Sequence, residues 1–234
     1  MENLANIQII QNIVYIVSSV MFIIGIKMLG KEATAVKGNY LSALAMFSAV
    51  GITCLSLEID PKIILAGVLI GGLIGSLIAL KVKMTAIPEM VALFNGFGGL
   101  ATFLIAWSQF NELNNSIFQH VLIMLTIYIG GITFSGSIIA YGKLSEKLKL
   151  GKGSMITNVF ISFFYLSMPA LIYVIAEPSI SQFIPQIPSY FLIFLVITLI
   201  AGIGFVMPIG GGDMPVVISL LNSLSGIAAA FAGL

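Results

Sequence analysis

Charged side chains are scarce in this sequence. Aspartate, glutamate, lysine and arginine make up 8% of its 234 residues, against about 25% in an ordinary soluble domain. Hydrophobic residues make up 59%, and the mean hydropathy is +1.13. A soluble fold of this length needs enough polar surface to cover its core, and so few charges cannot provide it. We therefore expect an all-α fold whose apolar surface faces a lipid bilayer.

Cysteine and histidine are nearly absent as well. Cys54 is the only cysteine, which excludes a disulfide within the chain. His120 is the only histidine, and we interpret it as an interfacial residue rather than a proton carrier. A net charge of +1 gives no sign of a nucleic-acid partner. We expect no metal site, no catalytic residue and no bound cofactor in this chain.

Apolar runs recur along the whole sequence at the length that a membrane helix needs. A helix requires about 20 apolar residues to cross a hydrocarbon core of about 30 Å. Such runs occupy residues 7–29, 40–57, 63–80, 88–107, 117–141, 155–176, 190–207 and 214–234. They predict a polytopic bundle of about eight transmembrane helices, and residues 1–234 then form a single transmembrane domain.

The lysines are unevenly distributed between the predicted connections. Basic residues in short loops favour the cytoplasmic side of a membrane. The lysines that lie in or flank the odd-numbered connections are Lys27, Lys31, Lys37, Lys81, Lys83, Lys143, Lys147, Lys149 and Lys152, whereas the even-numbered connections contain only Lys62. This bias places the N-terminus outside.

Small residues recur every four positions in the third run, at Gly67, Gly71, Gly75 and Ala79. This spacing lets the backbones of two membrane helices approach closely. The stripe is therefore predicted to pack against a neighbouring helix rather than to carry chemistry.

A polar group at membrane depth is costly unless it faces protein or water. Glu89 falls in the predicted first turn of the fourth helix, where a helix dipole favours an acid. Asn95 lies about two turns deeper and shares a helical face with Gly98, Gly99 and Thr102. This polar, small-residue face is expected to point inward.

A second group surrounds the start of the last helix. Asp213 is placed to cap a helix whose first turn contains Pro215, and it follows Gly210, Gly211 and Gly212. The glycines do not predict a nucleotide site, because the strand and βαβ unit of a dinucleotide fingerprint are missing.

The last predicted helix carries a polar stripe formed by Ser219, Asn222, Ser223 and Gly226. By the loop count, Asn222 and Asn95 lie at similar depths, so both can face one aqueous cavity. The alternative is an interhelical hydrogen bond of about 0.6 kcal/mol without a transport role. In a third group, Thr133, Ser137 and Tyr141 share one face of the fifth helix, which packing explains.

Three segments together resemble the beta subunit of the proton-translocating NAD(P) transhydrogenase family. They are "MTAIPEMVALFNGFGGLA", "GGITFSGSIIAYGKL" and "IGGGDMPVVISLLNSLSGIAAA". They occur in the family's order, and "GKEATAVKGN" near the N-terminus also fits. In that family, peripheral domains bind NAD(H) and NADP(H) and exchange a hydride, while the membrane domain passes protons.

The resemblance implies roles for particular residues and implies partners. The proton pathway would include Asn95, Thr102, Ser219, Asn222 and Ser223. Coupling to the NADP(H)-binding domain would use Glu89, Gly211, Gly212 and Asp213. The implied partners are the lipid bilayer, the NADP(H)-binding domain and one or more transhydrogenase alpha subunits. The expected assembly is a dimer of the whole complex in the inner membrane of a bacterium.

Two departures limit the resemblance. The family's last membrane helix and NADP(H)-binding domain are expected to follow Leu234, so this chain alone cannot transfer a hydride. Asn95 stands where one branch of the family has a proton-carrying histidine, and an amide takes up no proton near pH 7. The resemblance then implies that the partner subunit supplies the histidine. A small-solute or ion transporter or channel is the alternative function, and a purely structural membrane anchor is a third.

Overall fold

The structure is a computed structural model that describes residues 2–56, 61–110, 117–148, 155, 158–159, 161–163, 166–167 and 188–233. All regular secondary structure in these ranges is helical, and no strand occurs within them. The predicted all-α class is therefore confirmed. Most of the predicted sixth helix, 155–176, lies outside the described residues, as does the side chain of His120.

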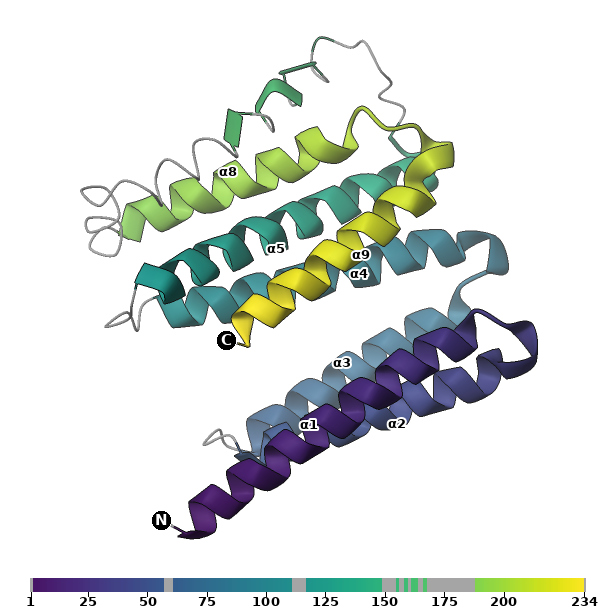
Figure 1. The fold of residues 1–234 in the computed structure, drawn as a ribbon. Coiled ribbons are helices and arrows are strands. Elements are labelled where there is room, and N and C mark those ends of the chain that lie inside the picture. The colour runs from purple at the N-terminus through teal and green to yellow at the C-terminus, as the bar shows by residue number, and fades with distance from the viewer. Residues whose placement is uncertain are drawn as a thin grey trace. The chain divides into compact units, whose positions relative to one another are not determined.

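Long α-helices make up the structure (Figure 1). They are α1 Glu2–Leu29, α2 Glu32–Ser56, α3 Pro61–Lys81, α4 Ile87–Phe110, α5 Ile117–Leu144, α8 Pro188–Val206 and α9 Met214–Ala232, with the 3-10 turns η1 Met84–Ala86 and η3 Gly211–Asp213. Among the described residues, six helices are long and apolar enough to span a membrane, and Phe194–Val206 forms a shorter apolar helix. These spans confirm a polytopic membrane bundle. Which end faces the cytoplasm stays a prediction.

The start of α2 differs from the prediction. This helix begins at Glu32 rather than near residue 40, so Lys37 lies on the helix and not in a connection. Glu32 stands in the first turn, where the helix dipole favours an acid. The Thr34 hydroxyl donates to the Met28 carbonyl oxygen at 2.7 Å and ties the two helices together. The apolar run located the greater part of the helix but not its polar first two turns.

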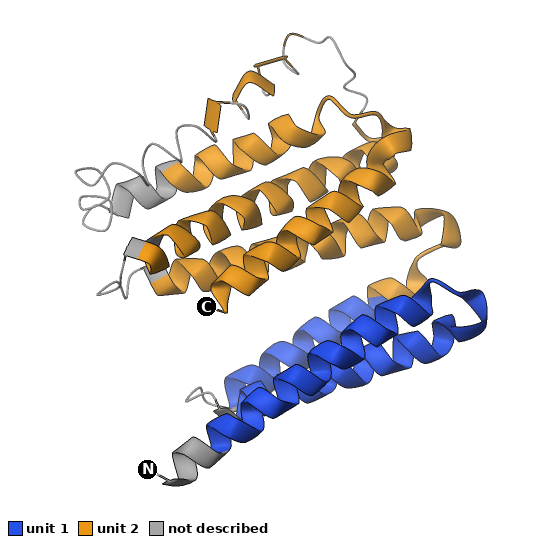
Figure 2. Ribbon diagram, in the orientation of Figure 1, with its two compact units in different colours: residues 1–77 blue, residues 78–234 orange. Residues whose placement is uncertain are grey.

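The chain forms two compact units, Met1–Leu77 and Ile78–Leu234 (Figure 2). In the first unit, α1 packs against α2 where Gly25 and Gly38 face each other. A Cβ on Gly38 would lie 2.7 Å from the Gly25 carbonyl oxygen, so only glycine permits this approach. The Tyr15 hydroxyl also makes a 2.8 Å hydrogen bond with Thr53 Oγ1.

The predicted contact of the α3 glycine stripe is not seen within the described part of its own unit. A Cβ built on Gly67, Gly71 or Gly75 meets nothing within 4 Å. The packing of this stripe against a neighbour therefore stays a prediction.

The second unit is built around α5, which packs against α4, α8 and α9. Glycines again set the spacing. A Cβ on Gly99 of α4 would lie 2.9 Å from the Gly130 carbonyl oxygen of α5. A Cβ on Gly202 of α8 would lie 2.5 Å from the Ile132 carbonyl oxygen. The close approach on two sides encloses the polar side chains of α5, including the fully buried Thr126, Thr133 and Ser137.

Candidate functional site

Asn95 and Ser137 form a polar pair between α4 and α5. The Asn95 amide nitrogen Nδ2 donates a hydrogen bond to Ser137 Oγ at 2.9 Å. Asn95 lies about two turns into α4, roughly 12 Å from its start, and is half-buried, whereas Ser137 is fully buried. The predicted inward orientation of Asn95 is thus found, and a residue that sequence reasoning assigned to packing is its partner.

The face of α4 that carries Asn95 agrees with the prediction in part. Gly99 and Thr102 are buried, and the Thr102 hydroxyl donates to the Gly98 carbonyl oxygen at 2.9 Å. Gly98 is exposed, and a Cβ built on it meets nothing within 4 Å. The expectation that Gly98 shares the inward face was therefore wrong, because the helix turns the third residue after Asn95 away from α5 while it keeps the fourth and the seventh on the α5 side.

Thr133 adds a second buried hydroxyl beside this pair. Its side chain has no exposed surface, and its Oγ1 has no hydrogen-bond partner among the described residues. Buried hydroxyls normally have a partner, so one that lacks it indicates a position where a further polar group is needed. Amide and hydroxyl groups accept and donate hydrogen bonds but hold no extra proton near pH 7. The cluster of Asn95, Ser137 and Thr133 can orient water and relay a proton, but it cannot store one.

The polar stripe of α9 is exposed in this chain. Ser219, Asn222, Ser223 and Gly226 are exposed, whereas α9 buries its aliphatic face through residues that include Val217, Ile218 and Leu221. The Ser223 hydroxyl donates to the Ser219 carbonyl oxygen at 3.1 Å. No hydrogen bond joins Asn222 to Asn95 among those found for the described residues, and a cavity shared by the two asparagines stays a prediction.

The predicted coupling residues lie near one end of the second unit. Gly211, Gly212 and Asp213 form the exposed turn η3 before α9. Asp213 occupies the N-cap position and Pro215 the first turn, as predicted, but the Asp213 side chain makes no capping hydrogen bond. Asp213 is therefore available to other partners. Glu89 lies in the first turn of α4 and is half-buried.

Two polar contacts escaped sequence reasoning. The Tyr128 hydroxyl makes a 2.9 Å hydrogen bond with Ser167, and both residues are buried. Lys143, counted in the sequence as a loop cation, is 8% exposed and binds backbone carbonyl groups at the end of α8. A lysine in the last turn of a helix interacts favourably with the helix dipole. No sequence pattern, however, predicts which carbonyl groups of another segment its side chain reaches.

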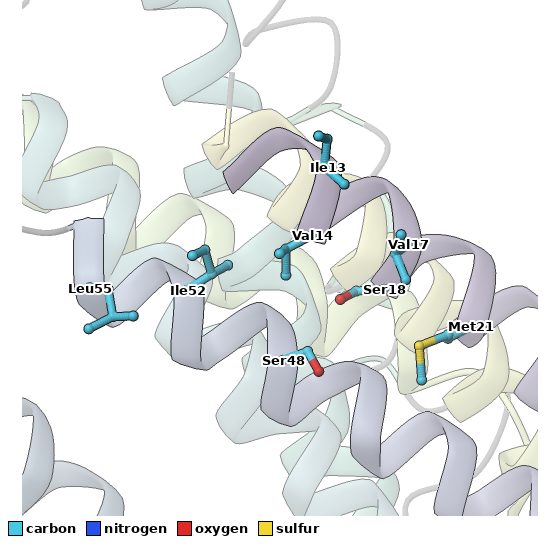
Figure 3. A pocket seen from close by; sticks show the side chains of 8 residues that line it. All are labelled: Ile13, Val14, Val17, Ser18, Met21, Ser48, Ile52 and Leu55. Carbon is cyan, nitrogen blue, oxygen red and sulfur yellow. The ribbon is translucent and has the colours of Figure 1, made fainter. Parts of the chain in front are cut away.

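The first unit contains a groove between α1 and α2 (Figure 3). Its lining consists of Ile13, Val14, Val17, Ser18, Met21, Ser48, Ile52 and Leu55. Ser18 Oγ is buried without a hydrogen-bond partner among the described residues. None of the lining residues is titratable, so the groove offers no proton chemistry.

Comparison with known proteins identifies the family. A profile described as NAD(P) transhydrogenase beta subunit matches residues 11–234. The chain is 35% identical over 233 residues to the NAD(P) transhydrogenase subunit beta of Rhodospirillum rubrum, and equally to that of a named strain of this species. The alignments cover 94% of this chain and 48% of each relative, so the chain spans about half the length of the curated relatives it matches. It belongs to the NAD(P) transhydrogenase beta subunit family.

Proposed function

We propose that this chain is the proton-conducting membrane part of an NAD(P) transhydrogenase. In the assembled enzyme, proton translocation is coupled to hydride transfer between NAD(H) and NADP(H), which other domains bind. The partners are one or more alpha subunits and the NADP(H)-binding domain, in a dimer of the whole complex in a bacterial inner membrane. By the lysine bias, Lys83 and Lys147 lie on the cytoplasmic side.

The observation that carries the proposal is the hydrogen bond between Asn95 and Ser137. It joins two helices that are apolar enough to span a membrane, at a depth where an unpaired amide is costly. Thr102 and Thr133 extend the polar surface on either helix. None of these groups binds a proton near pH 7. The resemblance to the family implies that a histidine of the partner subunit carries the proton, and in this proposal the present chain supplies the residues that orient it and its water.

The exposed stripe of α9 supports a partner at a second position. Hydrocarbon does not solvate an asparagine side chain, so Asn222 requires protein or water against it. Ser219 and Ser223 lie one turn apart on the same exposed face. A partner helix that covers this face, with water between, completes a second part of the proton pathway.

The turn at Gly211, Gly212 and Asp213, together with Glu89, forms the surface that couples this pathway to the NADP(H)-binding domain. Gly211, Gly212 and Asp213 are exposed. Asp213 also makes no capping hydrogen bond, so its carboxylate is free to contact a cationic group of that domain.

Substitution of Asn222 in the complete complex tests the proposed function. Asn222→Leu removes the polar group from the exposed stripe, and hydride transfer and proton uptake in reconstituted vesicles should fall together by about tenfold, equivalent to roughly 1.4 kcal/mol of barrier. Val216→Leu, on the same helix and 72% exposed, is the control and should retain both rates. An Asn222→Leu complex that assembles and pumps at the parent rate would remove Asn222 from the pathway.

A further inference from the structure

Lys143 is the one buried cation identified among the described residues, and its surroundings are unusual. It stands in the last turn of α5, and its ammonium group donates hydrogen bonds to the backbone carbonyl oxygens of Val206 at 3.3 Å, of Ile209 at 2.6 Å and of Met207. An ammonium group has three donors, and all three are therefore used on one short segment. No carboxylate forms an ion pair with Lys143 in the described part of the chain.

These carbonyl groups belong to the end of α8 and the turn that follows it. The last carbonyls of a helix have no partner within the helix and carry the negative end of its dipole. The buried lysine donates hydrogen bonds to these carbonyl groups and places a positive charge at the negative end of the dipole. Its charge is therefore tolerated there without a neighbouring carboxylate. The backbone is close as well, because a Cβ on Gly211 would lie 3.7 Å from the Lys143 carbonyl oxygen. The end of α5 thus holds the segment between α8 and α9 by side chain and backbone.

The same helix also carries Ser137, the partner of Asn95. Ser137 and Lys143 are about 9 Å apart along α5, because each residue adds 1.5 Å. One rigid element therefore contacts Asn95 at one position and the segment before Asp213 at the other. No other described helix makes a polar side-chain contact to both places.

We propose that Lys143 is a positioning residue that fixes segment 206–213 to the end of α5 and so sets the position of Asp213. The second half of this inference rests on the proposed function, in which Asp213 contacts the NADP(H)-binding domain. Lys143 itself carries no proton in this scheme. Lys143 keeps the exposed turn at a fixed position against the end of α5. When a change at Asn95 and Ser137 moves α5, the turn and the coupling surface move with it.

The attachment is tested first by a buried reporter in the complete complex. In a Cys54→Ala background, Met207→Cys places a thiol at a position that is 4% exposed, so a water-soluble maleimide reacts with it only when the segment opens. Lys143→Met should raise the labelling rate by at least about tenfold, because loss of even one of the three hydrogen bonds from the charged ammonium group corresponds to about that factor. Lys143→Arg keeps donors and charge and should restore slow labelling.

Lys147→Met is the matched control, since Lys147 is exposed and donates to the Tyr141 hydroxyl at 3.2 Å. In the Lys147→Met variant the maleimide should react with the thiol at position 207 at the parent rate. If Lys143→Met prevents assembly, Lys143→Gln keeps two N–H donors without the charge and should label at an intermediate rate. A parent rate in Lys143→Met, or in Lys143→Gln where that variant replaces it, overturns the inference.

The positioning role is tested by the ratio of protons taken up to hydride transferred in reconstituted vesicles. A merely structural loss lowers both rates in proportion and leaves this ratio unchanged, whereas a displaced Asp213 lowers the ratio by at least about twofold, with Lys143→Arg recovering it. An unchanged ratio together with fast labelling refutes the positioning role. If the parent complex itself takes up no protons, the proposed function is wrong. In that case the labelling rates alone decide whether Lys143 holds segment 206–213.

Discussion

The first and second units bury their helices to very different extents. In α1 and α2 of the first unit, 11% of the most apolar stretch of each helix is buried, and in α3 none of it is, whereas in α5 of the second unit the share is 72%. Glycines allow close helix approach in both units. Among the described residues, it is in the second unit that this approach encloses an interhelical asparagine and a cation. Close packing by itself therefore does not identify a functional site, and neither do enclosed hydroxyl groups, which the first unit also has at Tyr15, Ser18 and Thr53. The enclosed asparagine and cation are what distinguish the second unit.

The largest effect on stability is expected where a glycine touches another backbone. Gly202→Leu places a Cβ 2.5 Å from the Ile132 carbonyl oxygen and 2.9 Å from the Ile132 Cα, and a backbone cannot yield as a side chain can. The cost should be about 3 kcal/mol. Gly72→Leu on α3, where a Cβ meets nothing within 4 Å, is the control, with a change within about 0.5 kcal/mol.

Thermal unfolding of the detergent-solubilised chain, followed by helical circular dichroism, measures this difference. Equal losses in the two variants would mean that α3 is as tightly covered as α5, and the contrast between the units would disappear.

A smaller loss is expected at the polar pair. Ser137→Ala removes the acceptor of the Asn95 amide, which should cost about 0.6 kcal/mol, the average for interhelical hydrogen bonds in membrane proteins. Ser76→Ala on α3 removes an exposed hydroxyl that bonds only within its own helix, to Gly72 and Leu73, and should have no measurable effect. The same unfolding experiment compares the two, and a loss at Ser76 that matches the loss at Ser137 contradicts the assignment.

The smallest effect on stability is expected at the coupling turn. Asp213 is exposed and makes no capping hydrogen bond, so Asp213→Asn should change stability by less than about 0.5 kcal/mol. The charge is nevertheless lost, and coupled turnover of the complete enzyme should fall. Because asparagine caps a helix as well as aspartate does, normal turnover in Asp213→Asn would contradict the coupling role and leave Asp213 as a cap.

Much of the helical framework is predictable, because apolar runs define what crosses a membrane. The runs 63–80 and 88–107 fall within α3 and α4 and end within a few residues of their limits. The start of α2 was missed because the residues from Glu32 to Tyr40 are too polar to count as apolar, although they form a helix.

The direction in which a polar face points is harder to predict. Asn95 was expected to face inward and does, because Gly96 and Gly99 beside it bring α5 close. The Asn222 stripe is exposed in this chain, since α9 packs its aliphatic face against α5 and α4, and the aqueous path along the stripe stays a prediction. A periodic pattern shows that two faces differ, but which face a neighbour covers depends on the whole set of contacts.

The pairing of Ser137 with Asn95 is a feature of the site that the sequence did not predict. In an antiparallel helix pair, residues at similar distances from the connecting loop lie opposite each other, and by the helix limits this count places Ile132 rather than Ser137 opposite Asn95. The pairing depends on the register of α4 against α5, which Gly99 and Gly130 set by backbone contact. That register follows from three-dimensional fit and not from hydropathy.

The central claim is that the polar pair between α4 and α5 belongs to the proton pathway. Its most direct test is hydride-driven proton uptake by the complete complex in sealed vesicles, comparing the parent, Asn95→Leu and the control Phe97→Leu, which alters a residue that is 57% exposed. The account predicts that Asn95→Leu slows proton uptake and hydride transfer together by about tenfold, while Phe97→Leu matches the parent. An Asn95→Leu complex that assembles and takes up protons at the parent rate would contradict it.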